Sequence, residues 1–147
     1  MCVAAGGALF TWHQLRGGSA ARRGEVRDRE PVTEASLAAH AKRRGALAAG
    51  KALYIERCAQ CHGDRGQGSV GPNLTDRYFL HGRGTLVDLY EVVSAGVPGQ
   101  GMPAWSGELT PTELRDVVAF VGSLRLTNVP GKAPEGAASA ASEAPPL

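Results

Sequence analysis

The chain has 147 residues and a formal net charge of +2, a length that suits one small domain with tails. The excess positive charge lies in residues 13–45, where eight basic residues accompany four acidic ones, whereas residues 46–126 hold seven basic and eight acidic residues. The main domain therefore lacks a basic surface for nucleic acid, and no run reaches the roughly 20 apolar residues that a membrane-spanning helix needs.

The N-terminal residues predict an extension rather than a folded domain. Residues 1–12 are apolar but short and lack a basic leader, so we expect the remnant of a signal or membrane anchor that starts further upstream. Cys2 is then a candidate lipid-bearing cysteine, or else a free thiol. Residues 13–45 predict a flexible basic arm, in which Thr33 can begin a short helix that ends near Arg44.

Three helices are predicted between the two ends of the chain. The first covers residues 46–57, where small and apolar residues recur at helical spacing. The second opens at Thr85, with an acidic residue three positions later, and ends before Gly96. The third opens at Thr110 with a proline at its first helical position and carries a clear apolar face. Residues 46–126 are therefore predicted to form one helical domain with a thin core.

The C-terminal segment, residues 127–147, changes in composition to Pro, Gly, Ala and Ser. Such a segment offers few apolar side chains for burial. We expect it to be a disordered tail.

The most informative motif follows the first predicted helix directly: Cys58-Ala59-Gln60-Cys61-His62. Two cysteines three positions apart lie on nearly one side of a helical turn, so both sulfurs can reach the two vinyl groups on one edge of a haem. His62 comes next and can place its ring under the iron as the proximal ligand. The motif predicts one covalently attached haem c.

Other readings of the same residues lack their usual context. A redox-active dithiol would follow a strand in a βαβ unit, but the residues before Cys58 are predicted to be helical. A zinc site would need a second pair of ligands, and the remaining candidates, Cys2, His40 and His81, stand singly. Residues 66–71 match a dinucleotide-binding glycine pattern, but Pro72 and Asn73 follow them where that pattern would open a helix, which predicts a loop at the haem edge.

Two residues compete for the second axial position on the iron. Met102 lies between Gly101 and Pro103, outside the helical apolar stripes, and a thioether suits an iron that alternates between two oxidation states. Met102 is the expected ligand. His81 is the alternative, and a site with two histidines would have a lower reduction potential.

These motifs resemble those of a class I cytochrome c domain. The resemblance covers residues 46–126 and is carried by Gly50, Tyr54, Cys58, Cys61, His62, the run Gly71-Pro72-Asn73-Leu74, the run Gly101-Met102-Pro103 and Phe120. Within this class, the segment from Pro72 to Trp105 is most similar to the haem domain of subunit III of cbb-type haem–copper oxidases.

The resemblance implies an all-α cytochrome c fold, with three to five helices around one haem and the first and last helices crossing near Gly50 and Phe120. It also implies that the carbonyl of Pro72 accepts a hydrogen bond from His62. Trp105 is either a neighbour of the haem propionates or a packing residue. The residues Tyr78, Arg65, Arg77 and Arg83 are either further neighbours of the haem propionates or solvated and packing residues.

The function expected from these features is that of a monohaem electron carrier between redox partner proteins of a respiratory or dehydrogenase chain, with no catalytic residue of its own. The alternative is a haem-bearing subunit fixed in a membrane oxidoreductase complex, and a third reading is a ligand-binding sensor or peroxidase with an open sixth position. The resemblance places the domain in the periplasm, tethered to the membrane if residues 1–12 belong to an anchor.

Overall fold

The computed structural model of the chain describes residues 30–139. The expectations for residues 1–12, for Cys2 and for most of the basic arm lie outside the described residues. The described elements are α2 (Glu34–Ala41), α3 (Ala46–Arg57), α4 (Ala59–His62), β1 (Tyr78–Phe79), α5 (Leu86–Ala95), the 3₁₀ turns η1 (Pro98–Gln100) and η2 (Trp105–Gly107), α6 (Pro111–Leu124) and β2 (Ala137–Ala138). Within residues 30–139, no helix combines the length and apolar character needed to cross a bilayer.

Each of the longer helices that the sequence predicted is present, and two of them begin with the predicted caps. Thr85 accepts a hydrogen bond from the backbone N–H of Asp88, and the Asp88 carboxylate accepts one from the backbone N–H of Thr85. Thr110 and Glu113 form the same reciprocal pair before α6, with Pro111 at the first helical position. These boxes satisfy N–H groups that have no partner within the helix, which is why α5 and α6 start where they do.

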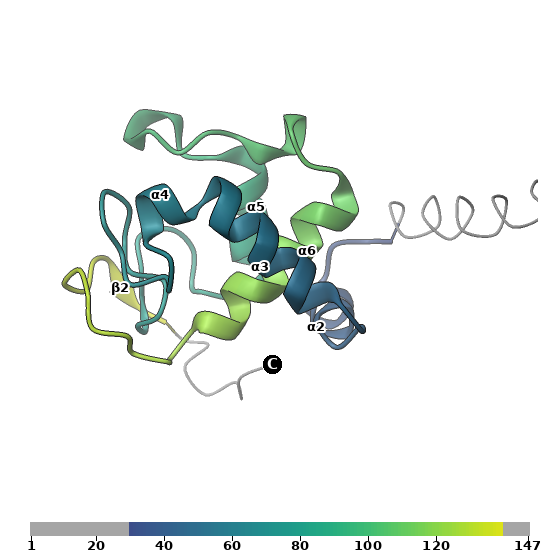
Figure 1. Cartoon of the computed structure of the whole chain (residues 1–147), viewed down its shortest axis with the longest axis horizontal. Coiled ribbons are helices and arrows are strands. Elements are labelled where there is room, and N and C mark those ends of the chain that lie inside the picture. The colour runs from purple at the N-terminus through teal and green to yellow at the C-terminus, as the bar shows by residue number, and fades with distance from the viewer. Residues whose placement is uncertain (1–29, 140–147) are drawn as a thin grey trace, which may run out of the picture. The chain divides into compact units, whose positions relative to one another are not determined.

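The core of the molecule forms where α3 crosses α6, near the centre of Figure 1. At Gly50 the two backbones come so close that an added Cβ would overlap the carbonyl oxygen of Asp116. One turn further on, the rings of Tyr54 and Phe120 lie 5.2 Å apart in a tilted arrangement. Tyr54 is fully buried, and its hydroxyl donates to the carbonyl of Gly63, which ties α3 to the end of the cysteine-containing turn.

Helix α2 packs against α6 and α5, and two polar contacts fix it there. The Glu34 carboxylate accepts hydrogen bonds from the backbone N–H groups of Leu86 and Val87 and so caps the start of α5. At the other end of α2, the buried His40 lies 2.6 Å from a carboxylate oxygen of Asp116 on α6. The short helix predicted after Thr33 is α2, and it is therefore packed against the other helices instead of belonging to a flexible N-terminal segment.

The segment after α6 also differs from expectation. We predicted disorder from residue 127 onward, but residues 127–139 follow an ordered path along the loop between α4 and α5, on the α4 side of Figure 1. There β2 pairs antiparallel with β1, with Tyr78 opposite Ala138 and Phe79 opposite Ala137. This segment buries few apolar side chains and is held by backbone hydrogen bonds, which composition does not reveal. Residues 140–147 lie outside the described residues.

Candidate functional site

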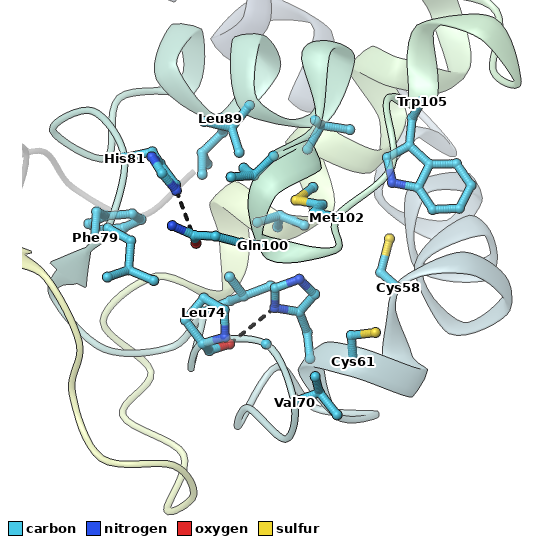
Figure 2. Close-up of a pocket in the computed structure, with 18 of the residues that line it drawn as sticks. Cys58, Cys61, Val70, Leu74, Phe79, His81, Leu89, Gln100, Met102 and Trp105 are labelled. Carbon is cyan, nitrogen blue, oxygen red and sulfur yellow. Dashed lines mark hydrogen bonds between the residues drawn. The ribbon is translucent and has the colours of Figure 1, made fainter.

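An apolar cavity of about 230 Å³ lies between α3, α5, α6 and the two loops that flank α5. Residues Leu89, Val93, Val117 and Val121 belong to the buried core and also line this cavity. Figure 2 shows part of the lining, with Cys58 and Cys61 at one edge and His81 at the opposite edge. The candidate haem-contacting residues that we named from the sequence, Cys58, Cys61, His62, Pro72, Met102 and Trp105, all line the cavity.

The two cysteines lie at the junction of α3 and α4. Cys58 ends α3 and precedes α4, and its backbone N–H still donates to the carbonyl of Tyr54. Both thiols are free, and Cys61 is exposed whereas Cys58 is half-buried. Burial raises the pKa of the unattached Cys58 thiol to about 11, with a smaller contribution from Cys61.

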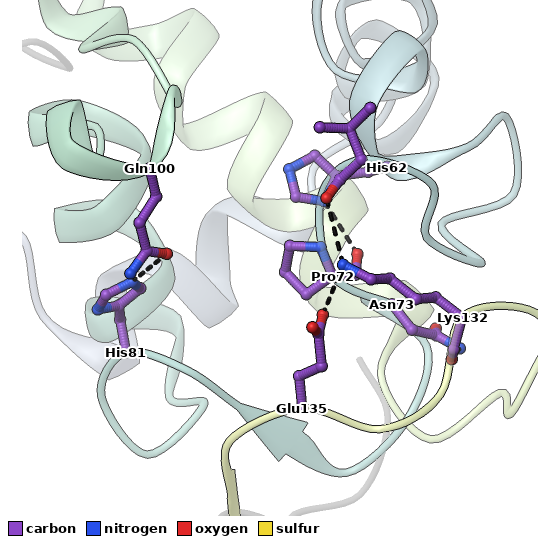
Figure 3. Close-up of polar contacts among 8 residues, drawn as sticks. His62, Pro72, Asn73, His81, Gln100, Lys132 and Glu135 are labelled. Atoms are coloured by element: carbon purple, nitrogen blue, oxygen red, sulfur yellow. Dashed lines mark hydrogen bonds and ion pairs between the residues drawn. The ribbon is translucent and has the colours of Figure 1, made fainter.

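His62 is held as a neutral imidazole with one nitrogen available. Its Nδ1 lies 3.1 Å from the carbonyl oxygen of Pro72, to which it can donate a hydrogen bond, as Figure 3 shows. Burial lowers the pKa of His62, and the Pro72 bond offsets only part of that shift. The ring also lies flat against Gly71, where an added Cβ would come within 2.8 Å of it. With the proton on Nδ1, the lone pair of Nε2 is free to bind a metal.

Met102 is held by a short hairpin that closes immediately after α5. The backbones of Val97 and Met102 exchange two hydrogen bonds, of 2.8 and 3.3 Å, in an isolated antiparallel bridge. The turn between them contains η1 and then Gly101, whose φ of +81° is a conformation that favours glycine. The hairpin brings the half-buried Met102 side chain to the cavity, where Figure 2 shows its sulfur.

His81, the alternative axial ligand, also lines the cavity, but it is exposed. Its Nε2 lies 3.5 Å from the side-chain oxygen of Gln100, at the edge away from the cysteines (Figure 2). This contact links the loop after β1 to the hairpin that carries Met102. No local pattern indicated Gln100 as a lining residue, because its partner His81 is 19 positions away.

The remaining polar candidates divide into two groups. Tyr78 and Trp105 line the cavity, whereas Arg65, Arg77 and Arg83 are absent from its lining. Arg57 is the lining arginine, and we did not select it from the sequence. Its place directly before Cys58, at the end of α3, was the signal that could have found it.

The cavity fits a c-type haem on chemical grounds. It presents two thiols at one edge, a neutral imidazole with a free nitrogen, a thioether and otherwise mainly apolar walls, which together are the donor set and surroundings of a covalently attached haem. A helix and not a strand precedes Cys58, and within residues 30–139 no three His, Cys, Asp or Glu side chains gather as a metal site.

The helical fold around this cavity and its donor set define a class I c-type cytochrome domain, which carries one covalently bound haem c. The sequence comparison gives the family: residues 45–121 match the model described as cytochrome c oxidase, cbb3-type, subunit III, and the chain belongs to that family. The resemblance and the all-α fold expected from the sequence are confirmed.

Curated relatives of the chain include subunits of cbb3-type oxidases. It is 40% identical to the cbb3-type cytochrome c oxidase subunit FixP of Bradyrhizobium diazoefficiens over 93 residues, which cover 60% of this chain and 31% of the relative. It is 41% identical to subunit CcoP of Rubrivivax gelatinosus over 85 residues, which cover 57% of this chain and 28% of the relative. The matched region thus spans less than a third of the length of these relatives.

Solved structures with the same fold include two cytochromes cL. The one from Methylophaga aminisulfidivorans aligns with a TM-score of 0.55 at 24% identity and covers 65% of this chain and 74% of its own. The one from Hyphomicrobium denitrificans aligns with a TM-score of 0.52 at 30% identity and covers 55% of this chain and 48% of its own. The likeness to the first shows the fold alone.

Proposed function

We propose that this domain transfers single electrons through a haem held by Cys58 and Cys61 and ligated by His62 and Met102. The haem, when bound, supplies a one-electron ferric/ferrous couple. The observation that carries the proposal is the convergence of two thiols, a neutral imidazole and a thioether on one apolar cavity. Because His62 and Met102 would both bind the iron of a haem held in this cavity, electron transfer is favoured over ligand binding.

The protein residues have distinct tasks in this proposal. The thiols fix the position of the porphyrin, and the Pro72 carbonyl orients the imidazole and increases its electron donation. The Val97–Met102 bridge fixes the backbone from which the thioether reaches the cavity. Core side chains exclude water from the cavity, which reduces the reorganisation that each electron transfer requires.

We further propose that the domain works as a haem-bearing subunit of a membrane oxidoreductase complex, on the periplasmic side. The family match and the cbb3-type relatives support this reading over the free carrier that we favoured from the sequence. Redox partners within a respiratory chain follow from the same proposal.

Purification from native membranes tests the choice between subunit and carrier. The membranes are solubilised in a mild detergent and fractionated by size, and the haem c of this chain is located by peroxidase staining after denaturing electrophoresis. We expect it in a high-molecular-mass fraction together with oxidase activity. Elution as a haem protein of about the chain's own mass would contradict the subunit reading and support the carrier.

Replacement of Met102 by alanine tests the axial ligand. In the wild-type ferric protein we expect a near-infrared charge-transfer band from sulfur to iron, and we expect Met102→Ala to abolish it. The ferrous variant should bind carbon monoxide at neutral pH, because the sixth position is then open. His81→Ala is the matched control and should keep the band.

Two results would contradict Met102 as the ligand. One is a wild-type spectrum without the charge-transfer band across the neutral pH range. The other is a band that survives in Met102→Ala.

A further inference from the structure

The C-terminal segment lies against the loop that contains Pro72. We call residues 127–139 the arm from here on; they are distinct from the basic segment of residues 13–45. Its backbone N–H groups at Asn128 and Lys132 donate to the carbonyls of Thr75 and Gln67, at 3.0 and 2.8 Å. The arm therefore contacts the loop on both sides of Pro72, before it at Gln67 and after it at Thr75.

Contacts of the arm come within two residues of Pro72. Asn73, the next residue, is buried, and its side-chain N–H group lies 3.4 Å from the carbonyls of both Val129 and Lys132. On the other side, Lys132 Nζ donates to the carbonyl of Val70 at 3.2 Å. Figure 3 shows Asn73 and Lys132 beside Pro72 and His62.

The loop needs such external partners because its own interior is polar. Thr75 is fully buried, and its hydroxyl donates to the side-chain oxygen of Asn73 and accepts from the backbone N–H of Val129. A buried polar group that loses its partner costs on the order of 1–3 kcal/mol. Release of the arm would leave Asn73 and Thr75 short of partners, so we expect the loop to rearrange with it.

We propose that the arm is a brace that holds the Pro72 carbonyl on Nδ1 of His62 and thereby sets the reduction potential of the haem iron. The proposal rests on the proposed ligation by His62. A firm Nδ1–H···O bond makes the imidazole a stronger donor, and a stronger donor favours the ferric state. Loosening the brace should weaken that bond and raise the reduction potential.

Gly131→Ala tests the brace without changing any loop residue. Gly131 lies directly on the loop, and an added Cβ would overlap the carbonyl oxygen of Gln67. We expect the reduction potential of the holoprotein to rise and the His62 Nδ1–H proton of the ferrous form, followed by NMR, to exchange roughly tenfold faster. Gly107→Ala is the matched control, since nothing lies within 4 Å of its added Cβ, and it should leave both values unchanged.

A second variant decides the question if Gly131→Ala does not fold or leaves the arm in place. Lys132 forms a 2.8 Å ion pair with Glu135, so the double variant Lys132→Met/Glu135→Gln removes the bond to Val70 while the net charge is unchanged. Because both charges are removed, their electrostatic effects on the reduction potential largely cancel. The loss of the hydrogen bond between the arm and Val70 remains. The reduction potential and the exchange rate of the His62 Nδ1–H proton should shift in the same direction as for Gly131→Ala, but by a smaller amount.

The outcomes separate this inference from the proposed function. Faster exchange of the Asn128 and Lys132 amides, with an unchanged potential and unchanged Nδ1–H exchange, would overturn the brace. So would a double variant with wild-type values. If instead the wild-type protein shows no iron-bound His62 ring resonance, the ligation itself is wrong.

Discussion

Replacement of both Cys58 and Cys61 by alanine is expected to give a protein that holds no covalent haem and is largely unfolded. The structure provides the reason: Leu89, Val93 and Val117, which are buried core residues, are also walls of the haem cavity. Without the haem, the apolar surface that these side chains turn to the cavity loses its packing partner. A domain of this size has little other core with which to offset the entropy of folding.

Far-ultraviolet circular dichroism and urea titration of the double variant check this expectation. Helical signal should fall to a small fraction of the wild-type value, and the cooperative urea transition should disappear. Cys2→Ala is the matched control, because it removes a cysteine outside the motif and should leave haem content and stability unchanged. A double variant that still unfolds cooperatively would show that the polypeptide core suffices.

The helices of the haem domain were predictable because their signals are local. The caps at Thr85 and Thr110 use partners three residues away, and the apolar stripe of α6 is visible at helical spacing. The same holds for the candidate ligands. The spacing from Cys58 to His62 is short enough that a helical turn alone fixes their relation, and Met102 stands out by its place between turn residues.

The contacts that sequence reasoning missed join residues far apart in the chain. His40 and Asp116 are 76 positions apart, and Glu34 caps a helix more than 50 positions away. Neither a lone histidine nor a lone glutamate in a basic segment indicates such a partner. The arm was missed for a related reason, since its Pro, Gly and Ala composition predicts disorder, whereas its order comes from backbone hydrogen bonds to a loop more than 50 residues earlier.

Replacement of Gly50 by alanine is the substitution outside the haem ligands from which we expect the largest loss of stability. An added methyl group would overlap the Asp116 carbonyl, and it would also lie 3.0 Å from Cβ of Phe120. The Asp116 carbonyl belongs to the backbone of α6, so no side-chain rotation can relieve the overlap. The two helices must therefore move apart. Overpacking of a close contact typically costs 1–3 kcal/mol, and we expect Gly50→Ala to lower the free energy of unfolding of the holoprotein by about 3 kcal/mol.

The consequences of that movement should reach beyond stability, because the crossing also fixes neighbouring contacts. Asp116 lies within hydrogen-bond distance of His40 on α2. One turn from Gly50, Tyr54 packs on Phe120, and the Tyr54 hydroxyl donates a hydrogen bond to the carbonyl of Gly63, next to the haem motif. Urea denaturation followed through the haem absorbance measures the loss. Gly107→Ala serves again as the control, since its added methyl meets open space. A Gly50→Ala protein as stable as this control would mean that α3 and α6 can separate at little cost, and that the haem rather than the helix crossing holds the domain together.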